Sequence, residues 1–112
     1  MFQPLAGKRV IETTQVLAGP YCTYQLALMG AEVIKIEKPG QGDWTRQGGS
    51  DADLEAAGLP LSFVTQNAGK KSVTLDLKTP QGLAVLKHLV QDSDIFGENF
   101  SPGTAARLGI GY

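Results

Sequence analysis

The clearest sign of the fold lies in residues 9–37, which read RVIETTQVLAGPYCTYQLALMGAEVIKIE. The β-prone run at 9–14 predicts a strand that leads into a glycine and a proline. Pro20 suits the first position of a helix, where its missing N–H costs nothing, and Gly30 suits the residue just past the helix end. Residues 32–37 combine branched apolar residues with charges at both ends and predict a second strand. Strand, helix and strand together form a βαβ unit.

A second set of the same elements follows after a long insertion. SVTLDL, at 72–77, alternates apolar and polar side chains strictly, which predicts a strand with one buried face. Thr79 and Pro80 are typical of a helix cap and first turn, and an apolar stripe continues from there through residue 91. DIFGEN, at 94–99, predicts a return to the sheet, and SPGTAARLG starts a short helix.

This order of elements predicts an α/β fold in which two βαβ units form a parallel sheet with helices on its faces. Residues 38–62 hold five glycines and two prolines with little periodicity, which indicates a long loop, either functional or mobile. Ligands of such sheets bind at the carboxyl ends of the strands. The candidate site therefore comprises four loops, at residues 14–20, 37–42, 78–80 and 98–103.

Composition narrows the class of protein. Of the 112 residues, 29 are Leu, Ile, Val or Phe, a share above the roughly 20% below which disorder is expected, so the chain should fold as one domain or part of one. The net charge of -1 comes without a basic stripe, which argues against nucleic acid as a partner. No apolar run approaches the length of a membrane span, and a single cysteine allows no internal disulfide, so we expect a cytoplasmic protein.

The turn after the first strand suits an anion or a polarised carbonyl, because Gly19 and Pro20 open a helix there. A dinucleotide fingerprint needs three glycines at this turn, and only Gly19 is present. Glu37 does end the second strand, where a ribose-binding acid would lie. A plain tight turn and a small dinucleotide-binding domain both remain open, the former being favoured.

Cations at loop ends suit phosphates. Lys70, Lys71 and Lys78 flank the predicted strand at 72–77, Lys38 follows the second strand, and Arg107 lies near the end of the chain. The alternative is that these lysines form a solvated charged face, because most lysines in proteins are exposed. The local sequence favours this simpler interpretation.

Asn99 and Phe100 place an amide and an aromatic ring at a strand end, which suits an adenine ring or, alternatively, a capped turn. Cys22 shares a predicted helix face with Leu26 and Met29, so we interpret it as a small packed hydrophobe. His88 has no second ligand at suitable spacing and is predicted to lie at the surface. These patterns indicate a phosphorylated ligand without an evident catalytic group or metal site.

Three blocks of the sequence are informative when they are taken together: PLAGKRVIETTQVLAGPYCTYQLALMGAEVIKIEKPGQGDWTR, NAGKKSVTLDLKTPQG and ENFSPGTAARLGIGY. In this order they resemble the start of the family III CoA-transferases, which include formyl-CoA transferase and carnitine CoA-transferase, with the alpha-methylacyl-CoA racemases as relatives. The resemblance implies that residues 1–112 are the CoA-binding, Rossmann-like amino-terminal portion of a longer chain. It also implies a homo-oligomer of two interlocked subunits and a nucleophilic aspartate downstream of this chain, so no catalytic residue is expected here.

The resemblance assigns ten positions to coenzyme A. The first three positions lie in the loop beside the thioester and help to form the acyl pocket. The next three positions meet the phosphates, the adenine and its ribose phosphate. The last four positions hold the rest of the nucleotide and the pantetheine arm. In chain order they are Val16, Leu17, Ala18, Lys38, Leu75, Lys78, Asn99, Phe100, Arg107 and Leu108.

Some positions depart from the family pattern. Leu17 stands where formyl-CoA transferase has a glutamine, which removes an amide suited to an oxalate-like acid. Gly69 and Ser101 replace an asparagine and an arginine, which weakens the expected phosphate contacts.

We therefore expect a protein that transfers CoA between acyl-CoA thioesters and small carboxylic acids, of which this chain forms the CoA-binding part. A truncated, non-catalytic module for CoA-nucleotide binding or for assembly is the alternative from outside the enzymes. The small dinucleotide-binding domain is the third possibility.

Overall fold

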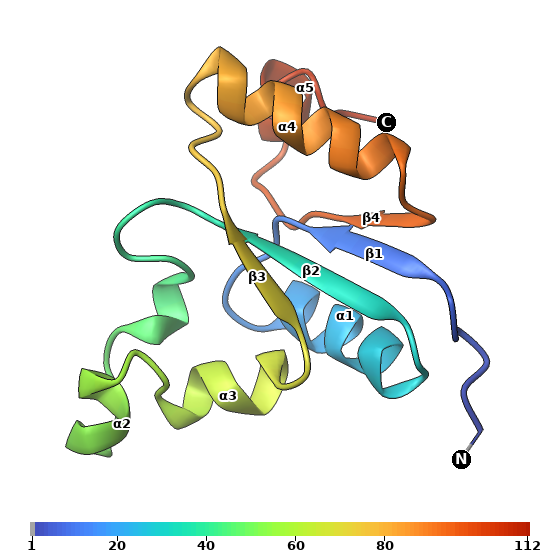
Figure 1. Cartoon of the computed structure of the whole chain (residues 1–112). Coiled ribbons are helices and arrows are strands. Elements are labelled where there is room, and N and C mark those ends of the chain that lie inside the picture. Colours follow the sequence, from blue (N-terminus) through green and yellow to red (C-terminus); the bar gives the residue numbers. More distant parts are fainter. Residues whose placement is uncertain (1) are drawn as a thin grey trace.

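The computed structural model describes residues 2–112 and confirms the predicted α/β class. Its sheet has four strands in the order β3-β2-β1-β4, and every neighbouring pair is parallel (Figure 1). This order matches the first four strands of the Rossmann order 3-2-1-4-5-6. The strands are β1 (Arg9–Glu12), β2 (Glu32–Glu37), β3 (Lys71–Thr74) and β4 (Ile95–Gly97).

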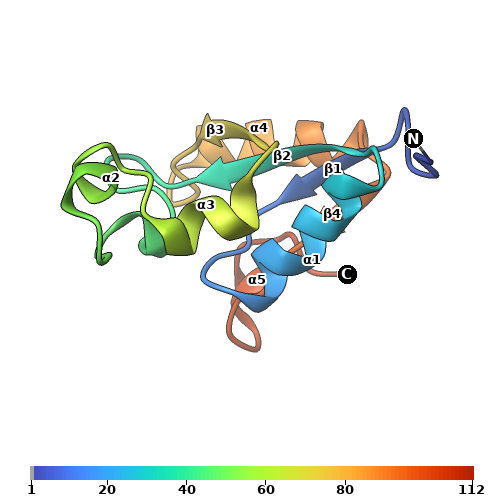
Figure 2. The ribbon, with the colours of Figure 1, turned by 90° about the horizontal axis from the view of Figure 1, so that it is seen from below.

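Helices cover both faces of this sheet. The helix α1 (Ala18–Leu28) and the helix α3 (Leu61–Asn67) lie on one face, and α4 (Pro80–Gln91) lies on the other, with the short α5 (Thr104–Arg107) beside it (Figures 1 and 2). The first βαβ unit joins neighbouring strands. The second, β3-α4-β4, spans the whole sheet, because its strands lie at the two opposite edges.

The core consists of two apolar clusters, one on each face of the sheet. Val10, Ala31 and Val33 are buried under α1, whereas Ile11 and Ile36 are buried under α4. Successive residues of a strand point to opposite faces, so neighbours such as Val10 and Ile11 enter different clusters. Leu86 of α4 completes the second cluster.

The predicted inward face of α1 is wrong. Cys22 and Met29 are exposed, while Pro20 and Thr23 are the buried residues of this helix. The periodicity of apolar residues misled the prediction because the contact surface of α1 is partly polar, as the hydrogen bonds of Thr23 described below show. Only Leu26 of the expected set packs against the apolar core.

The segment from 38 to 62 is more regular than the predicted loop. It contains a 3-10 turn, η1 (Trp44–Arg46), a short helix, α2 (Ala52–Ala56), and the start of α3. The side chains of Asp43 and Asp51 accept hydrogen bonds from the first backbone N–H groups of η1 and α2. Such capping stabilises short helical turns that have no apolar periodicity.

The other elements agree with the sequence apart from their bounds. β3 ends at Thr74, earlier than predicted, although the N–H of Leu75 still donates to the carbonyl of Glu37 at 3.0 Å. β1 and β4 are also shorter than the predicted strands. The predicted cap of α4 is confirmed, since the hydroxyl of Thr79 accepts a hydrogen bond from the N–H of Gly82 at 3.0 Å.

Candidate functional site

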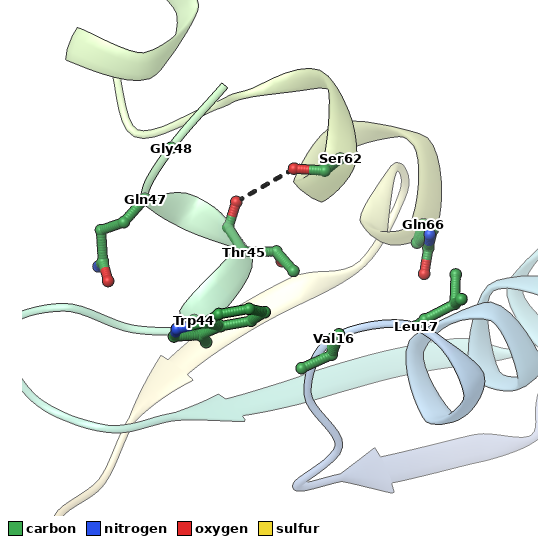
Figure 3. Close-up of a pocket in the computed structure, with 8 residues that line it drawn as sticks. All are labelled: Val16, Leu17, Trp44, Thr45, Gln47, Gly48, Ser62 and Gln66. Atoms are coloured by element: carbon green, nitrogen blue, oxygen red, sulfur yellow. Dashed lines mark hydrogen bonds between the residues drawn. The ribbon is translucent and has the colours of Figure 1, made fainter. Parts of the chain in front are cut away.

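A cavity of about 380 Å³ opens where β1 and β2 end (Figure 3). Three segments contribute to it: the turn after β1, the η1 turn after β2, and one side of α3. Its lining combines apolar side chains with hydroxyl and amide groups, a composition typical of small-molecule sites. The lining residues are Val16, Leu17, Trp44, Thr45, Gln47, Gly48, Ser62 and Gln66.

The turn after β1 holds Val16 in an unusual backbone conformation. Its φ of 73° lies in the left-handed region, which a β-branched residue rarely adopts. The preceding residue, Gln15, is fixed by Asn99, whose amide accepts from the Gln15 N–H at 3.0 Å and donates to the Gln15 carbonyl at 2.8 Å. The Gln66 amide faces the carbonyls of Leu17 and Val16, and assigning its nitrogen to the side that faces them gives donor–acceptor distances of 3.0 and 3.2 Å. Strained backbone persists only when its surroundings over-determine it, and it is enriched at functional sites.

The η1 turn forms the opposite wall. Asp43 Oδ1 accepts hydrogen bonds from the N–H and the hydroxyl of Thr45 at 2.8 and 2.7 Å, which fixes the turn. The Trp44 ring borders the cavity and is 63% exposed (Figure 3). From α3, the hydroxyl of Ser62 donates to the Thr45 carbonyl at 3.5 Å.

A buried ionic cluster lies behind both walls. Lys35 Nζ donates to the carbonyl of Thr14 at 2.7 Å and pairs with Asp43 Oδ2 at 2.7 Å and, more distantly, with Glu12 Oε1 at 3.6 Å. Lys70 Nζ lies 2.9 Å from the same Glu12 oxygen. All four charged side chains are at least 98% buried, and two positive charges balance two negative ones. Buried charges are tolerated only when they are paired in this way.

The pKa shifts of this cluster follow from burial and pairing. Burial acts to raise the pKa of Asp43, but hydrogen bonds from Lys35 and Thr45 outweigh it and hold that pKa below its ordinary value. Burial lowers the pKa of Lys70, and the contact with Glu12 opposes the shift only in part. The prediction of a solvated face is wrong for Lys70, whose ammonium also bonds Thr23 and Asn67.

A partly buried ion pair joins Arg46 of η1 to Glu37 at the end of β2. Arg46 contacts the carboxylate of Glu37 in a fork, Nε to Oε1 at 2.7 Å and Nη2 to Oε2 at 2.8 Å. Ser72 and the N–H of Asp43 donate to the same carboxylate. Although burial acts to raise the pKa of Glu37, these donors lower it from 4.5 to about 2. The Arg46 guanidinium also lies over the ring of Phe63, 3.8 Å from its centroid.

The structure brings some of the ten predicted positions together. Val16 and Leu17 line the cavity, and Asn99 is held against the same turn through Gln15. Lys38 is exposed and lines a neighbouring polar cavity of about 290 Å³ between the ends of β2 and β3. Leu75 follows β3 next to that point, but it is half-buried and packs in the core.

The remaining predicted positions lie outside both cavities. Ala18 is exposed at the start of α1. Lys78 is exposed between β3 and α4, and Phe100 is half-buried after β4. Arg107 is exposed on α5, where its guanidinium donates to the hydroxyl of Thr104, and the adjacent Leu108 is half-buried. His88 is exposed on α4, as predicted.

Sequence reasoning missed the η1 and α3 contributions to the cavity and the cluster behind it. Trp44 and Gln66 carry no local signal that they meet the turn after β1. The position of Lys35 did contain a usable signal, because a charge in the middle of a strand with buried neighbours needs a partner. Asp43, two residues before Thr45, is a residue type typical of a helix N-cap, so the sequence could also have predicted a helical turn after it.

The arrangement defines a class of protein: an open parallel α/β sheet whose cavity lies at the carboxyl ends of the strands, close to the point where the strand order reverses between β1 and β4. The family model for CoA-transferase family III matches residues 5–112, and the chain belongs to this family. Within residues 2–112, no helix has the length and apolar character needed to cross a membrane.

Curated relatives match nearly all of this chain. It is 46% identical, over 97% of its length, to succinate--glutarate CoA-transferase from Agrobacterium fabrum, and 44% identical, over its whole length, to formyl-CoA:oxalate CoA-transferase from Afipia carboxidovorans. It is 41% identical to succinyl-CoA:glutarate CoA-transferase from Mus musculus, over 98% of its length. The chain spans only about a quarter of the length of these relatives, 28%, 26% and 24% respectively.

Solved structures agree with the fold. A hypothetical protein from Mycobacterium tuberculosis is 44% identical with a TM-score of 0.86, covering 98% of this chain and 29% of its own. A CAIB/BAIF family protein from Brucella suis is 36% identical with a TM-score of 0.87, covering all of this chain and 30% of its own.

Proposed function

We propose that this chain forms the CoA-binding portion of a protein that transfers CoA between an acyl-CoA thioester and a small carboxylic acid. The observation that carries this proposal is the strand-end cavity, in which the strained turn at Val16 and Leu17 faces the Trp44 turn. Family membership and the transferase names of the relatives support it independently.

In this proposal the thioester lies at the turn after β1, and the acyl group enters the cavity. Leu17 and Trp44 present apolar surface there and offer no charge to an acyl carboxylate. The polar lining of the cavity includes the hydroxyl of Ser62 and the amide of Gln47. Such a lining suits an acyl group with apolar carbons better than it suits oxalate, which exposes only carboxylate oxygens.

The nucleotide of CoA would extend from this turn across the ends of the other strands. Lys38 and Lys78 are exposed cations suited to phosphates, and the half-buried Phe100 offers a ring surface near the end of β4. Arg107 and Leu108 of the last helical turn would hold the pantetheine arm or the remaining nucleotide atoms.

The nucleophilic carboxylate is not expected within this chain. Asp43 is the aspartate nearest to the cavity, yet it is 1% exposed and paired with Lys35. A carboxylate held in this way is poorly suited to attack a thioester, because both of its oxygens are engaged. We therefore expect acyl transfer to need a carboxylate from outside residues 1–112, and the active protein to be a homo-oligomer.

The first test compares ligands by thermal unfolding. CoA is expected to raise the melting temperature of the 112-residue chain more than dephospho-CoA does, because the additional phosphate meets Lys38 or Lys78. At a hundredfold excess over its Kd, a ligand adds about 2.7 kcal/mol, roughly 10 °C for a domain of this size. Lys38→Ala should reduce the difference between CoA and dephospho-CoA, while Lys71→Ala, which removes an exposed lysine paired with Glu32, should not.

The outcomes separate the possibilities. Equal shifts with CoA and dephospho-CoA would refute the phosphate assignment, and no shift with either would refute CoA binding. A larger shift with NAD than with CoA would favour the small dinucleotide-binding domain. CoA binding with no transfer of CoA from a thioester to a carboxylic acid is expected of this chain alone, whereas turnover by the chain alone would reveal a nucleophile within it.

A further inference from the structure

We propose that Lys35 is a positioning residue for the cavity. Its buried ammonium group fixes the position of the Val16 turn relative to the Trp44 turn. This inference rests on the proposed function for its ligand. It deepens that function because the ammonium group joins the backbone of one wall to the capping residue of the other.

The contacts on the first wall are short. Lys35 Nζ donates to the carbonyl of Thr14 at 2.7 Å, two residues before the strained Val16. Thr14 is held a second time, because its hydroxyl donates to Glu12 at 2.5 Å. The backbone that enters the turn is therefore fixed at both its carbonyl and its side chain.

The contacts on the second wall are equally direct. The two oxygens of Asp43 divide their roles: Oδ2 pairs with Lys35 at 2.7 Å, and Oδ1 caps the η1 turn through Thr45. Trp44 lies between these two residues, so a shift of the Asp43 carboxylate moves the turn that carries the indole ring. A weaker direct link also joins the walls, from the Trp44 N–H to the Gln15 side chain at 3.4 Å.

Lys35 itself has little freedom to move. It lies within β2, paired in register with Glu12 of β1, and its side chain is 2% exposed. Its ammonium group donates one hydrogen bond, to the Thr14 carbonyl, and forms ion pairs with Asp43 and, more distantly, with Glu12. Loss of one partner from such a cluster leaves an uncompensated buried charge.

Lys70 provides an internal comparison. Its side chain is as deeply buried and contacts the same Glu12 carboxylate, but its other acceptors are the carbonyl of Pro20, Thr23 and Asn67. These residues belong to α1 and α3 and include neither cavity turn. Lys70 thus joins two helices to the sheet, whereas Lys35 joins the two cavity walls.

The test uses Trp44, the only tryptophan of the chain, as a local reporter. Lys35→Met keeps the length of the side chain and removes its charge. Because Trp44 is already 63% exposed, we expect acrylamide quenching of its fluorescence without ligand to increase by up to about half, and affinity for acetyl-CoA to fall about tenfold while affinity for CoA changes less than twofold. Lys71→Met, which removes an exposed lysine of β3, is the matched control and should change none of these quantities.

A second variant separates positioning from stability. Lys35→Met leaves two buried acids with one lysine, whereas Lys35→Met/Asp43→Asn restores one acid to one lysine, Glu12 and Lys70. The double variant should recover most of the melting temperature lost by the single one, because the charge balance returns. The increased quenching of Trp44 and the lowered ratio of acetyl-CoA affinity to CoA affinity should persist in the double variant, because the link between the walls is still missing.

Each result bears on one hypothesis. Wild-type quenching in the folded double variant, or equal loss of affinity for CoA and acetyl-CoA, would overturn the role of Lys35. If the wild-type chain binds neither compound, the proposed function fails, and the quenching measured without ligand still decides whether Lys35 positions the Trp44 turn. Circular dichroism shows which variants are folded.

Discussion

The Glu37–Arg46 pair offers the sharpest test of the energetics, because one substitution removes one charge from a defined contact. Glu37→Gln preserves the size of the side chain but removes the negative charge that Arg46, Ser72 and the Asp43 N–H all contact. The carboxylate is 5% exposed, so little water is available to replace these donors. We expect a clear loss of stability at neutral pH.

The magnitude follows from the pKa of Glu37, which falls from 4.5 to about 2 on folding. A lowered pKa means that the unfolded chain binds the proton more tightly, so the stabilisation is present above pH 4.5 and is lost as the pH falls toward 2. At 1.36 kcal/mol per pH unit, the difference between the two values corresponds to about 3 kcal/mol at pH 7 and about 2 kcal/mol at pH 3.5. The loss caused by Glu37→Gln should follow these two values.

The assay is urea unfolding of the wild-type and Glu37→Gln chains at both pH values. Taking the difference between the two proteins cancels the titration of the other carboxylates. A difference below about 1 kcal/mol that does not change with pH would refute the argument, because the pair would then behave as a solvated surface pair. Direct titration of the Glu37 carboxyl group by NMR gives a second, independent value, which should lie near 2 and not near 4.5.

Three further substitutions test the local backbone, each by urea unfolding at pH 7. Val16→Gly should raise the free energy of unfolding by up to about 1 kcal/mol, because glycine adopts the positive φ without strain; a decrease would show that the valine side chain contributes more by packing. Thr79→Ala should cost about 1 kcal/mol by removing the cap of α4. Gly82→Ala should cost about 3 kcal/mol or more, because its Cβ would lie 2.0 Å from the carbonyl oxygen of Asp76, and a stable variant would contradict this close approach.

The candidate site was only partly predictable. The carboxyl ends of parallel strands meet at one edge of a sheet, so the loops with Val16, Lys38 and Asn99 could be placed together before the fold was known. The contribution of Gln66 could not be predicted, because α3 follows a segment without apolar periodicity. The capping residues of that segment show where its helical turns begin, but they do not show where those turns pack. The buried state of Lys70 was likewise hidden, since lysines at strand ends are usually exposed.

The sequence by itself determined the two βαβ sets, the cap at Thr79 and the family, because local propensities and the order of motifs are properties of the chain. Tertiary structure alone decided which face of α1 is buried, and that Glu12 shares its carboxylate between Lys35 and Lys70. Those outcomes depend on contacts between residues that are 11 to 58 positions apart in the chain. A periodic pattern shows that a side chain needs a partner, but the packing of helices on the sheet selects the partner and thereby shapes the cavity.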